Sequence, residues 1–184
     1  MKLLAIFLLA CMLVMPAYGA AYLKIGDIKG EAAASGHENW ITLDSFSFGV
    51  EREMKESGEK GGTADINIGI GELQEITVSK PLDASSPLLA QAAASGNSLG
   101  TAEIEFVETG GADGKPAVYL KYKLDRVFVK SWSISGDADD RPTEEVSFYY
   151  NKIAFEYQGA GDKKSTSTAH FGWDNVKNKK WESR

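Results

Sequence analysis

Apolar and polar residues alternate with a period of two over most of residues 20–184. The alternation is clearest at Leu23 and Ile25, at Ile66, Ile68 and Ile70, at Ile76 and Val78, and at Ile104 and Phe106. Successive side chains of a β-strand point to opposite faces of its sheet. The pattern therefore predicts strands with one buried and one solvated face.

Three longer runs change phase partway along. Their apolar positions switch between odd and even residue numbers at Asp44-Ser45, at Asp125-Arg126 and at Asn151-Lys152. A one-residue slip would turn the apolar side chains to the wrong face, so each strand must bulge or bend at its switch. Strands that bend in this way curl into a barrel or pass between two packed sheets. We therefore expect a mainly all-β fold, with two packed antiparallel sheets forming a small bulged β-barrel.

A short α-helix is expected over residues 87–95. Ser86 is expected to cap it, Pro87 suits the first helical position, and Gly96 can adopt the left-handed conformation that ends a helix. Its apolar stripe consists of Leu88, Leu89, Ala92 and Ala93. A helix of this length is too short to form a layer, so we expect it to flank the barrel. The expected loops span residues 51–62, 109–116, 136–142 and 159–168.

Residues 1–19 differ in character from the rest of the chain. Lys2 precedes an apolar stretch over residues 3–15, and Pro16, Ala17 and Gly19 follow. This order is typical of a secretory signal peptide, with cleavage expected after Gly19. The stretch is shorter than the roughly 20 apolar residues that span a bilayer, so no stable membrane insertion is expected after its removal. Residues 20–184 then form one domain in a secreted or periplasmic protein.

Cys11 allows an alternative reading of this segment, as a lipid-modified cysteine. Under that reading the apolar residues 12–14 would follow directly behind the anchor. If residues 1–19 are instead removed, the remaining chain has no cysteine, because Cys11 is the only one in the sequence. Disulfide bonds and thiolate chemistry would then be excluded.

The charge of the chain disfavours a role in nucleic-acid binding. The whole chain has a formal charge of −6, and losing Lys2 with the leader makes the remainder one unit more negative. Neutralising phosphates requires a clustered basic surface. The only basic cluster is Lys177, Lys179 and Lys180, which we expect to be solvated.

Candidate catalytic and metal-binding patterns are weak. Residues 96–100 match the G-x-S-x-G pattern around Ser98, but a nucleophile elbow has a strand before it and a helix after it, and here the expected order is reversed. His37 and His170 lack the neighbours of a zinc site. Asp137, Asp139 and Asp140 lack the central Gly and closing Glu of a calcium loop. We therefore expect no enzyme activity, no metal and no cofactor.

Several segments occur in a characteristic order along the chain: residues 22–31, 36–41, 46–50, 83–89, the Ala-rich helix to Gly96, residues 141–148 and residues 171–174 ahead of Asn178. In this order they resemble the Hcp family, the hemolysin-coregulated proteins that build the inner tube of type VI secretion systems. Their order and spacing are more specific than any one of them, and together they span nearly all of residues 22–178. The resemblance implies a two-sheet barrel with one flanking helix. It also implies hexameric rings that stack into a tube and carry effector proteins, with tube-tip and sheath components as further partners.

The resemblance also suggests roles for particular residues. Ser47 points opposite to Phe46 and Phe48, so it is a candidate for contact with cargo in the ring lumen, or simply a solvent-exposed strand serine. Residues 51–62 look like the long loop through which such rings meet their neighbours. The charged residues of that loop are Glu51, Arg52, Glu53, Lys55, Glu56, Glu59 and Lys60.

The N-terminal segment departs from the family pattern, because tube-forming Hcp proteins leave the cytoplasm without a cleaved signal. Two hypotheses therefore stand. The chain is either a structural subunit of a type VI tube, or an exported Hcp-like paralogue that acts as a periplasmic or extracellular binding module.

Overall fold

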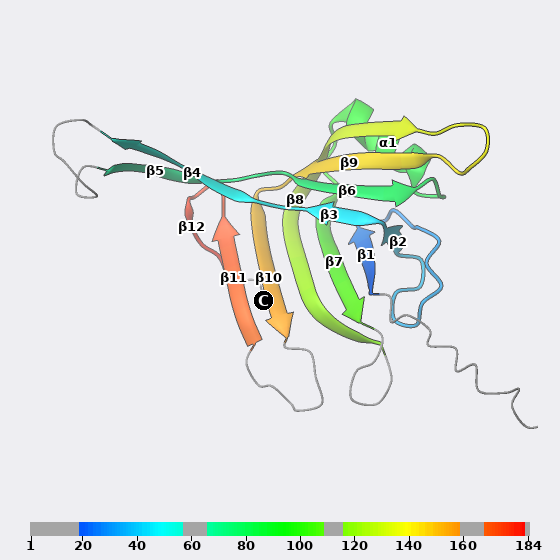
Figure 1. Ribbon diagram of the computed structural model, residues 1–184, viewed down its shortest axis with the longest axis horizontal. Coiled ribbons are helices and arrows are strands. Elements are labelled where there is room, and N and C mark those ends of the chain that lie inside the picture. The colour runs from blue at the N-terminus through cyan, green and yellow to red at the C-terminus, as the bar shows by residue number, and fades with distance from the viewer. Residues whose placement is uncertain (1–18, 57–65, 109–115, 159–167, 183–184) are drawn as a thin grey trace, which may run out of the picture.

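Two β-sheets and a helix share one hydrophobic core in the computed structural model, which describes residues 19–56, 66–108, 116–158 and 168–182 (Figure 1). The strands are β1 (Ala20–Ile25), β2 (Ile41–Leu43), β3 (Ser45–Ser47), β4 (Val50–Glu56), β5 (Ile66–Leu73), β6 (Ile76–Pro81), β7 (Gly100–Glu108), β8 (Ala117–Ser135), β9 (Thr143–Tyr149), β10 (Lys152–Gln158), β11 (Thr168–Asp174) and β12 (Lys179–Lys180). The helix α1 spans Ser86–Ser95. It is not long and apolar enough to cross a membrane, and the same holds for every helix in the described part of the chain.

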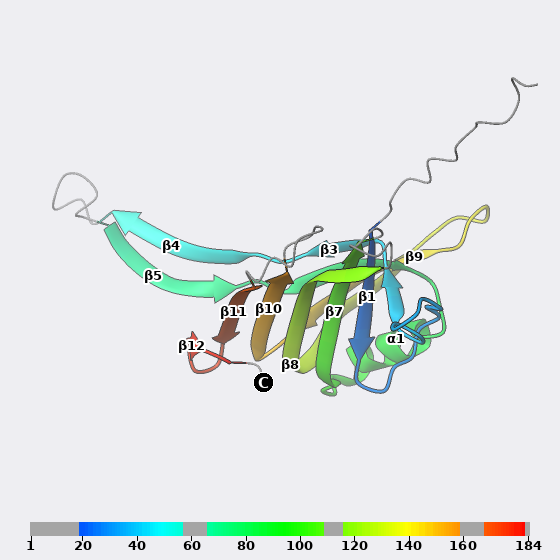
Figure 2. The ribbon, with the colours of Figure 1, turned by 90° about the horizontal axis from the view of Figure 1, so that it is seen from below.

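All strand pairs are antiparallel, and β8 connects the two sheets. The first sheet has the order β12-β11-β10-β8-β7-β1-β2. The second sheet contains β3, β6 and β9, and β9 pairs with the C-terminal half of β8. A separate ribbon, β4 paired with β5, extends away from both sheets (Figures 1 and 2). The predicted fold class is therefore confirmed.

The three phase switches fall where the chain passes from one sheet to the other. Asp44 separates β2, which pairs with β1, from β3, which pairs with β6. Arg126 lies at a register shift within β8 and has a φ of 57°. Asn151 lies between β9 in the second sheet and β10 in the first. Each predicted bend is therefore present. Because of it, the residues before and after the bend can both bury their apolar side chains.

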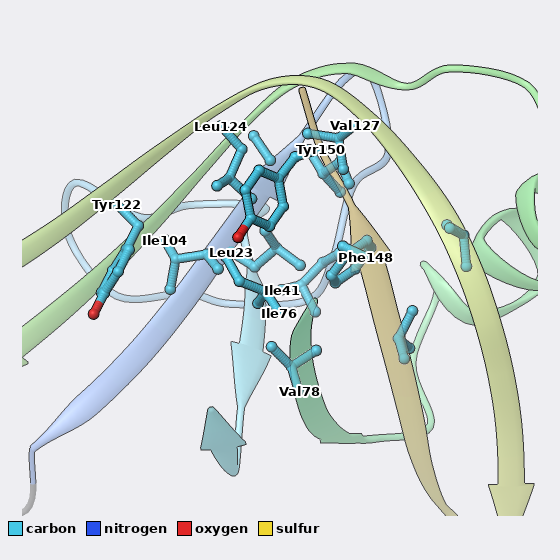
Figure 3. Packing of buried hydrophobic residues seen from close by; sticks show 14 of the residues in the cluster. Leu23, Ile41, Ile76, Val78, Ile104, Tyr122, Leu124, Val127, Phe148 and Tyr150 are labelled. Atoms are coloured by element: carbon cyan, nitrogen blue, oxygen red, sulfur yellow. The ribbon is translucent and has the colours of Figure 1, made fainter. Parts of the chain in front are cut away.

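The core lies between the two sheets (Figure 3). It contains residues from β1, β2, β6, β7, β8, β9 and β10, including Leu23, Ile41, Ile76, Val78, Ile104, Leu124, Val127, Phe148 and Ile153. Aromatic rings extend this core. The ring centroid of Tyr122 lies 4.8 Å from that of Phe46 and 5.2 Å from that of Phe155. The period-two pattern thus predicted most of the buried positions correctly.

The helix differs in detail from the prediction. Gly96 ends it with a φ of 66°, as expected, but the N-cap is Ser85 and not Ser86. Leu89 and Ala92 are buried, whereas Leu88 is 46% exposed and does not belong to the buried stripe.

The Ser86 hydroxyl is used in a buried polar cluster under the helix. Lys80 is fully buried, and its Nζ lies 2.9 Å from Asp83 Oδ1 and 3.1 Å from Glu144 Oε2. Lys80 also donates to Ser86 Oγ. Burial alone would raise the pKa of Asp83, but the hydrogen bonds from Lys80 and Ser85 outweigh it and lower that pKa. The cluster joins the start of α1 to the paired strands β6 and β9.

Of the expected loops, one is wrong in part, one is present, and the others lie mostly outside the described residues. Residues 51–56 were expected in a loop but form most of β4, because they pair with β5. The acidic stretch 136–142 does connect β8 to β9 as a loop. The structure does not describe residues 57–65, 109–115 and 159–167, in which most of the remaining expected loops lie.

Arg126 provides a test of the bulge in β8. Its left-handed backbone conformation costs a residue with a Cβ roughly 1–2 kcal/mol, whereas glycine adopts it freely. We expect Arg126→Gly to unfold at higher urea concentration than Arg126→Ala, with a free energy of unfolding about 1 kcal/mol larger. Arg126→Val should be the least stable of the three, and equal stabilities of all three variants would show that the bulge is not strained.

Candidate functional site

The sequence-based candidate nucleophile is a turn residue. Ser98 follows α1 and precedes β7, so the order of elements is opposite to that of a nucleophile elbow, as expected. Its Oγ donates to the Val127 carbonyl at 3.3 Å and accepts from the Gly100 backbone N–H at 3.2 Å. Ser98 therefore stabilises the connection between the helix and β7.

His37 has a structural role on the outer side of the first sheet. It is 6% exposed, its ring stacks on Tyr22, and its Nε2 lies 2.8 Å from Glu105 Oε2. Glu105 also accepts from Lys121 at 2.7 Å. Burial would raise the pKa of Glu105, but Lys121 and His37 lower it overall. These contacts fasten the segment before β2 to β1 and β7.

The other residues that were considered and disfavoured as metal ligands are His170, Asp137, Asp139 and Asp140. His170 is exposed on β11, and Asp137 and Asp140 accept backbone N–H bonds in the exposed turn before β9. Over residues 19–56, 66–108, 116–158 and 168–182, no three His, Cys, Asp or Glu side chains gather closely enough to hold a metal ion.

The most unusual feature of the surface is the β4–β5 ribbon, which we call the arm. It projects beyond the first sheet (Figures 1 and 2). Three of its large apolar side chains face solvent: Val50 is 55% exposed, Met54 64% and Ile70 66%. Ile70 was expected to be half-buried, and this expectation was wrong because its strand lies outside the barrel. The arm thus presents apolar side chains that the protomer itself leaves uncovered.

The predicted contact residues lie mainly on the arm. Glu51, Arg52 and Glu53 are exposed on β4, and Lys55 and Glu56 belong to the same strand. Arg52 donates to the Gly69 carbonyl at 2.6 Å, beside a register shift between the two strands. Glu59 and Lys60 lie outside the described residues. The structure therefore places five of the seven predicted charged residues on one paired ribbon.

The root of the arm is tied to the hydrophobic core. The hydroxyl of Tyr150, a residue only 2% exposed, donates to the Gln74 carbonyl at 2.7 Å. Gln74 in turn donates its backbone N–H to the Gly49 carbonyl at 2.9 Å. Burial raises the pKa of Tyr150, so its hydroxyl keeps its proton and remains a donor. The direction of the arm is therefore set from inside the barrel.

Ser47 belongs to a sheet face rich in hydroxyl groups. As predicted, it is exposed while Phe46 and Phe48 pack against the core. The same outer face of the second sheet carries Ser45, Thr77, Ser79, Ser131, Ser133 and Ser147. The Ser45 and Ser79 hydroxyls lie 2.6 Å apart, and those of Thr77 and Ser147 lie 3.0 Å apart. We call this surface the hydroxyl face.

Only Ser47 of this face was singled out from the sequence. The signal for the others was present, because serine alternates with apolar residues in Ser131-Trp132-Ser133-Ile134-Ser135. Alternation predicts that such residues share a face, but it does not predict which strands lie next to one another. The pairing of β3, β6, β9 and β8 is what gathers the hydroxyls.

Comparison with known proteins agrees with this architecture. A family model described as "Type VI secretion system effector, Hcp" matches residues 22–157. Protein hcp1 of Pseudomonas aeruginosa is 29% identical over 157 residues, which cover 83% of this chain and 93% of that protein. A solved structure of a type six secretion system protein has a TM-score of 0.77 at 28% identity, and the match covers 89% of this chain and 100% of the other.

A second solved structure supports the fold. The crystal structure of Hcp1 from Salmonella typhimurium has a TM-score of 0.69 at 24% identity, over 89% of this chain and 99% of its own. The resemblance predicted from the sequence segments is therefore confirmed.

The anchoring of the arm can be tested at Tyr150. We expect Tyr150→Phe to lower the free energy of unfolding by about 1 kcal/mol, because the Gln74 carbonyl loses its donor. Amide hydrogen exchange at Leu73 and Gln74 should also become faster. Tyr149→Phe is the matched control, since Tyr149 is 44% exposed, and it should change stability by less than about 0.5 kcal/mol. Equal effects of the two variants would contradict the anchoring role.

Proposed function

The chain belongs to the Hcp family of type VI secretion system proteins, and from this we propose that it is a structural subunit that assembles into hexameric rings. The rings stack into a tube and carry effector proteins, and the chain itself catalyses no reaction. The observation that best supports assembly is the arm.

An isolated two-stranded ribbon is at best marginally stable in water. In this chain the arm also exposes Val50, Met54 and Ile70. Within the described residues, β4 and β5 pair only with each other, so each keeps one open strand edge. Open edges and exposed apolar side chains together fit contact with another protomer.

Charged residues on the arm contribute more to the specificity of the contact between protomers than to its affinity. Exposed ion pairs are typically worth only about 0–1 kcal/mol each. Pairing of backbone edges fixes register and orientation, because the rows of N–H and C=O groups must match. We therefore assign the main energetic role to the apolar side chains, with Arg52 and Glu53 in a supporting role.

In such a ring, the hydroxyl face would line the channel. Ser47 lies on this face, and its position between two core phenylalanines directs it away from the barrel interior. The proposal thus places Ser47 in contact with cargo and the arm in contact with the neighbouring protomer.

Light scattering and negative-stain imaging of the purified protein test the assembly. We expect a mass six times that of the protomer and ring-shaped particles. The variant Met54→Ser/Ile70→Ser should weaken the ring by about 3 kcal/mol per interface, or roughly a hundredfold in dissociation constant, because two apolar side chains are lost from each contact.

The matched control is Met54→Leu/Ile70→Val, which keeps apolar side chains at both positions and should still form rings. A wild-type protein that stays monomeric over a wide concentration range would contradict the proposal. Rings that survive the serine variant would show that the arm does not hold them.

A second candidate function is that of an exported, Hcp-like binding module, and residues 1–19 favour it. A protomer that folds outside the cytoplasm could not be loaded under a cytoplasmic sheath. In this case the ring or monomer holds a ligand or partner protein in the periplasm or outside the cell.

Fractionation of cells that express the full chain distinguishes the two candidates. Export predicts a periplasmic protein that begins at Ala20, measured by intact mass. Ala17→Gln/Gly19→Gln should keep the leader attached, because signal peptidase needs small residues at these positions. Wild-type protein with an intact N-terminus in the cytoplasm would contradict export and favour the tube subunit.

A further inference from the structure

We propose that the hydroxyl face, together with the groove at the root of the arm, is a docking surface for a cationic polypeptide segment. The groove is open, has a volume of about 850 Å³, and is lined by Ser47, Glu51, Glu72, Glu75, Lys130 and Tyr149 among others. It lies where β3 and β6 of the second sheet meet β4 and β5 of the arm. The inference rests on the proposed function, because a ring would turn this face toward its cargo.

The hydroxyl face offers many weak polar contacts. Its serines and threonines are both donors and acceptors, and several already pair across strands. Such a surface accommodates a polar, extended chain in many registers. The charged groups at its edge therefore decide which kind of chain is favoured.

Those charged groups are unbalanced in favour of carboxylates. Among the described residues that line the groove, Lys130 is the only lysine or arginine, and it already forms an ion pair with Glu75. Glu145 adds a further exposed carboxylate to the adjoining face, between Ser79 and Ser133. An occupant that brings positive charge would restore the balance.

Glu51 and Glu72 show the imbalance most clearly. They stand directly opposite each other in the β4–β5 pair, and both are exposed. Like charges directly opposite in an antiparallel pair are destabilising. Neither has an ion-pair partner among the residues that the structure describes. A lysine or arginine side chain between the two carboxylates would turn this repulsion into attraction.

An aromatic pair that lines the groove fits the same kind of occupant. Tyr149 is 44% exposed, and its ring centroid lies 6.4 Å from that of Phe128. Lysine and arginine cations bind to the faces of such rings. The carboxylates, hydroxyls and aromatic rings therefore all favour a segment that carries lysine or arginine. The negative charge of the groove disfavours an acidic segment.

Binding of a labelled oligolysine peptide to protein expressed from the full chain tests this inference. We expect binding that weakens as salt is added, because exposed charges are screened. Glu51→Gln/Glu72→Gln should reduce the affinity roughly tenfold, the loss expected when about two charge contacts disappear. Oligoglutamate and glycine-serine peptides of the same length should not bind.

The control variant is Asp27→Asn/Asp139→Asn, which removes two exposed carboxylates elsewhere and leaves the same net charge. It should bind oligolysine like the wild type. Equal loss of affinity in both double variants, or in neither, would overturn the proposal, since binding would then follow net charge or avoid the groove.

Light scattering on the same samples separates this inference from the proposed function. Rings without oligolysine binding would overturn the docking surface and leave the ring. Oligolysine binding at Glu51 and Glu72 by a monomer would support the docking surface and contradict the ring.

Discussion

The fold depends on one geometric constraint, the fixed alternation of side chains along a β-strand. In two packed sheets with solvated outer faces, a strand buries apolar residues only on the face turned toward the other sheet, so a run that passes from one sheet to the other must change phase. This chain does so at Asp44, Arg126 and Asn151. The three bends lie where the chain passes from one sheet to the other. The bend at Arg126 lets the single strand β8 pair in both sheets and bury apolar residues on each side of the bend. Without these bends one half of each run would point its apolar residues into water.

The same constraint explains what could be predicted from the sequence. Leu23, Ile25, Val78 and Ile104 alternate with polar residues and are buried, because local alternation and burial coincide in the barrel. Ile70 follows the same pattern but is 66% exposed, because its strand lies on the arm. Alternation alone does not show how far a strand lies from the core. The expected loop was wrong over residues 51–56, which form a strand, for a related reason. Its charged residues have little strand preference, and pairing with β5 outweighed it.

The candidate site was predicted less completely than the fold. Ser47 could be placed on an outer face from its two phenylalanine neighbours alone. The groove beside it depends on which strands become neighbours, and that is a long-range property. Glu51 and Glu72 are far enough apart in sequence that only the register of β4 and β5 reveals their opposition. The link from Tyr150 to the arm is similar, because it joins the end of β9 to the backbone before β6.

Sites where a sequence breaks a local rule are often sites of function. The arm breaks two such rules, with apolar side chains in water and like charges directly opposite each other. The two violations differ in what would relieve them: a neighbouring apolar surface for Met54 and Ile70, and a cation for Glu51 and Glu72. One occupant could not easily satisfy both, since the first requires dry packing and the second a charged group. Under the two proposals above, the arm would therefore make two separable contacts, one with another protomer and one with a cationic segment.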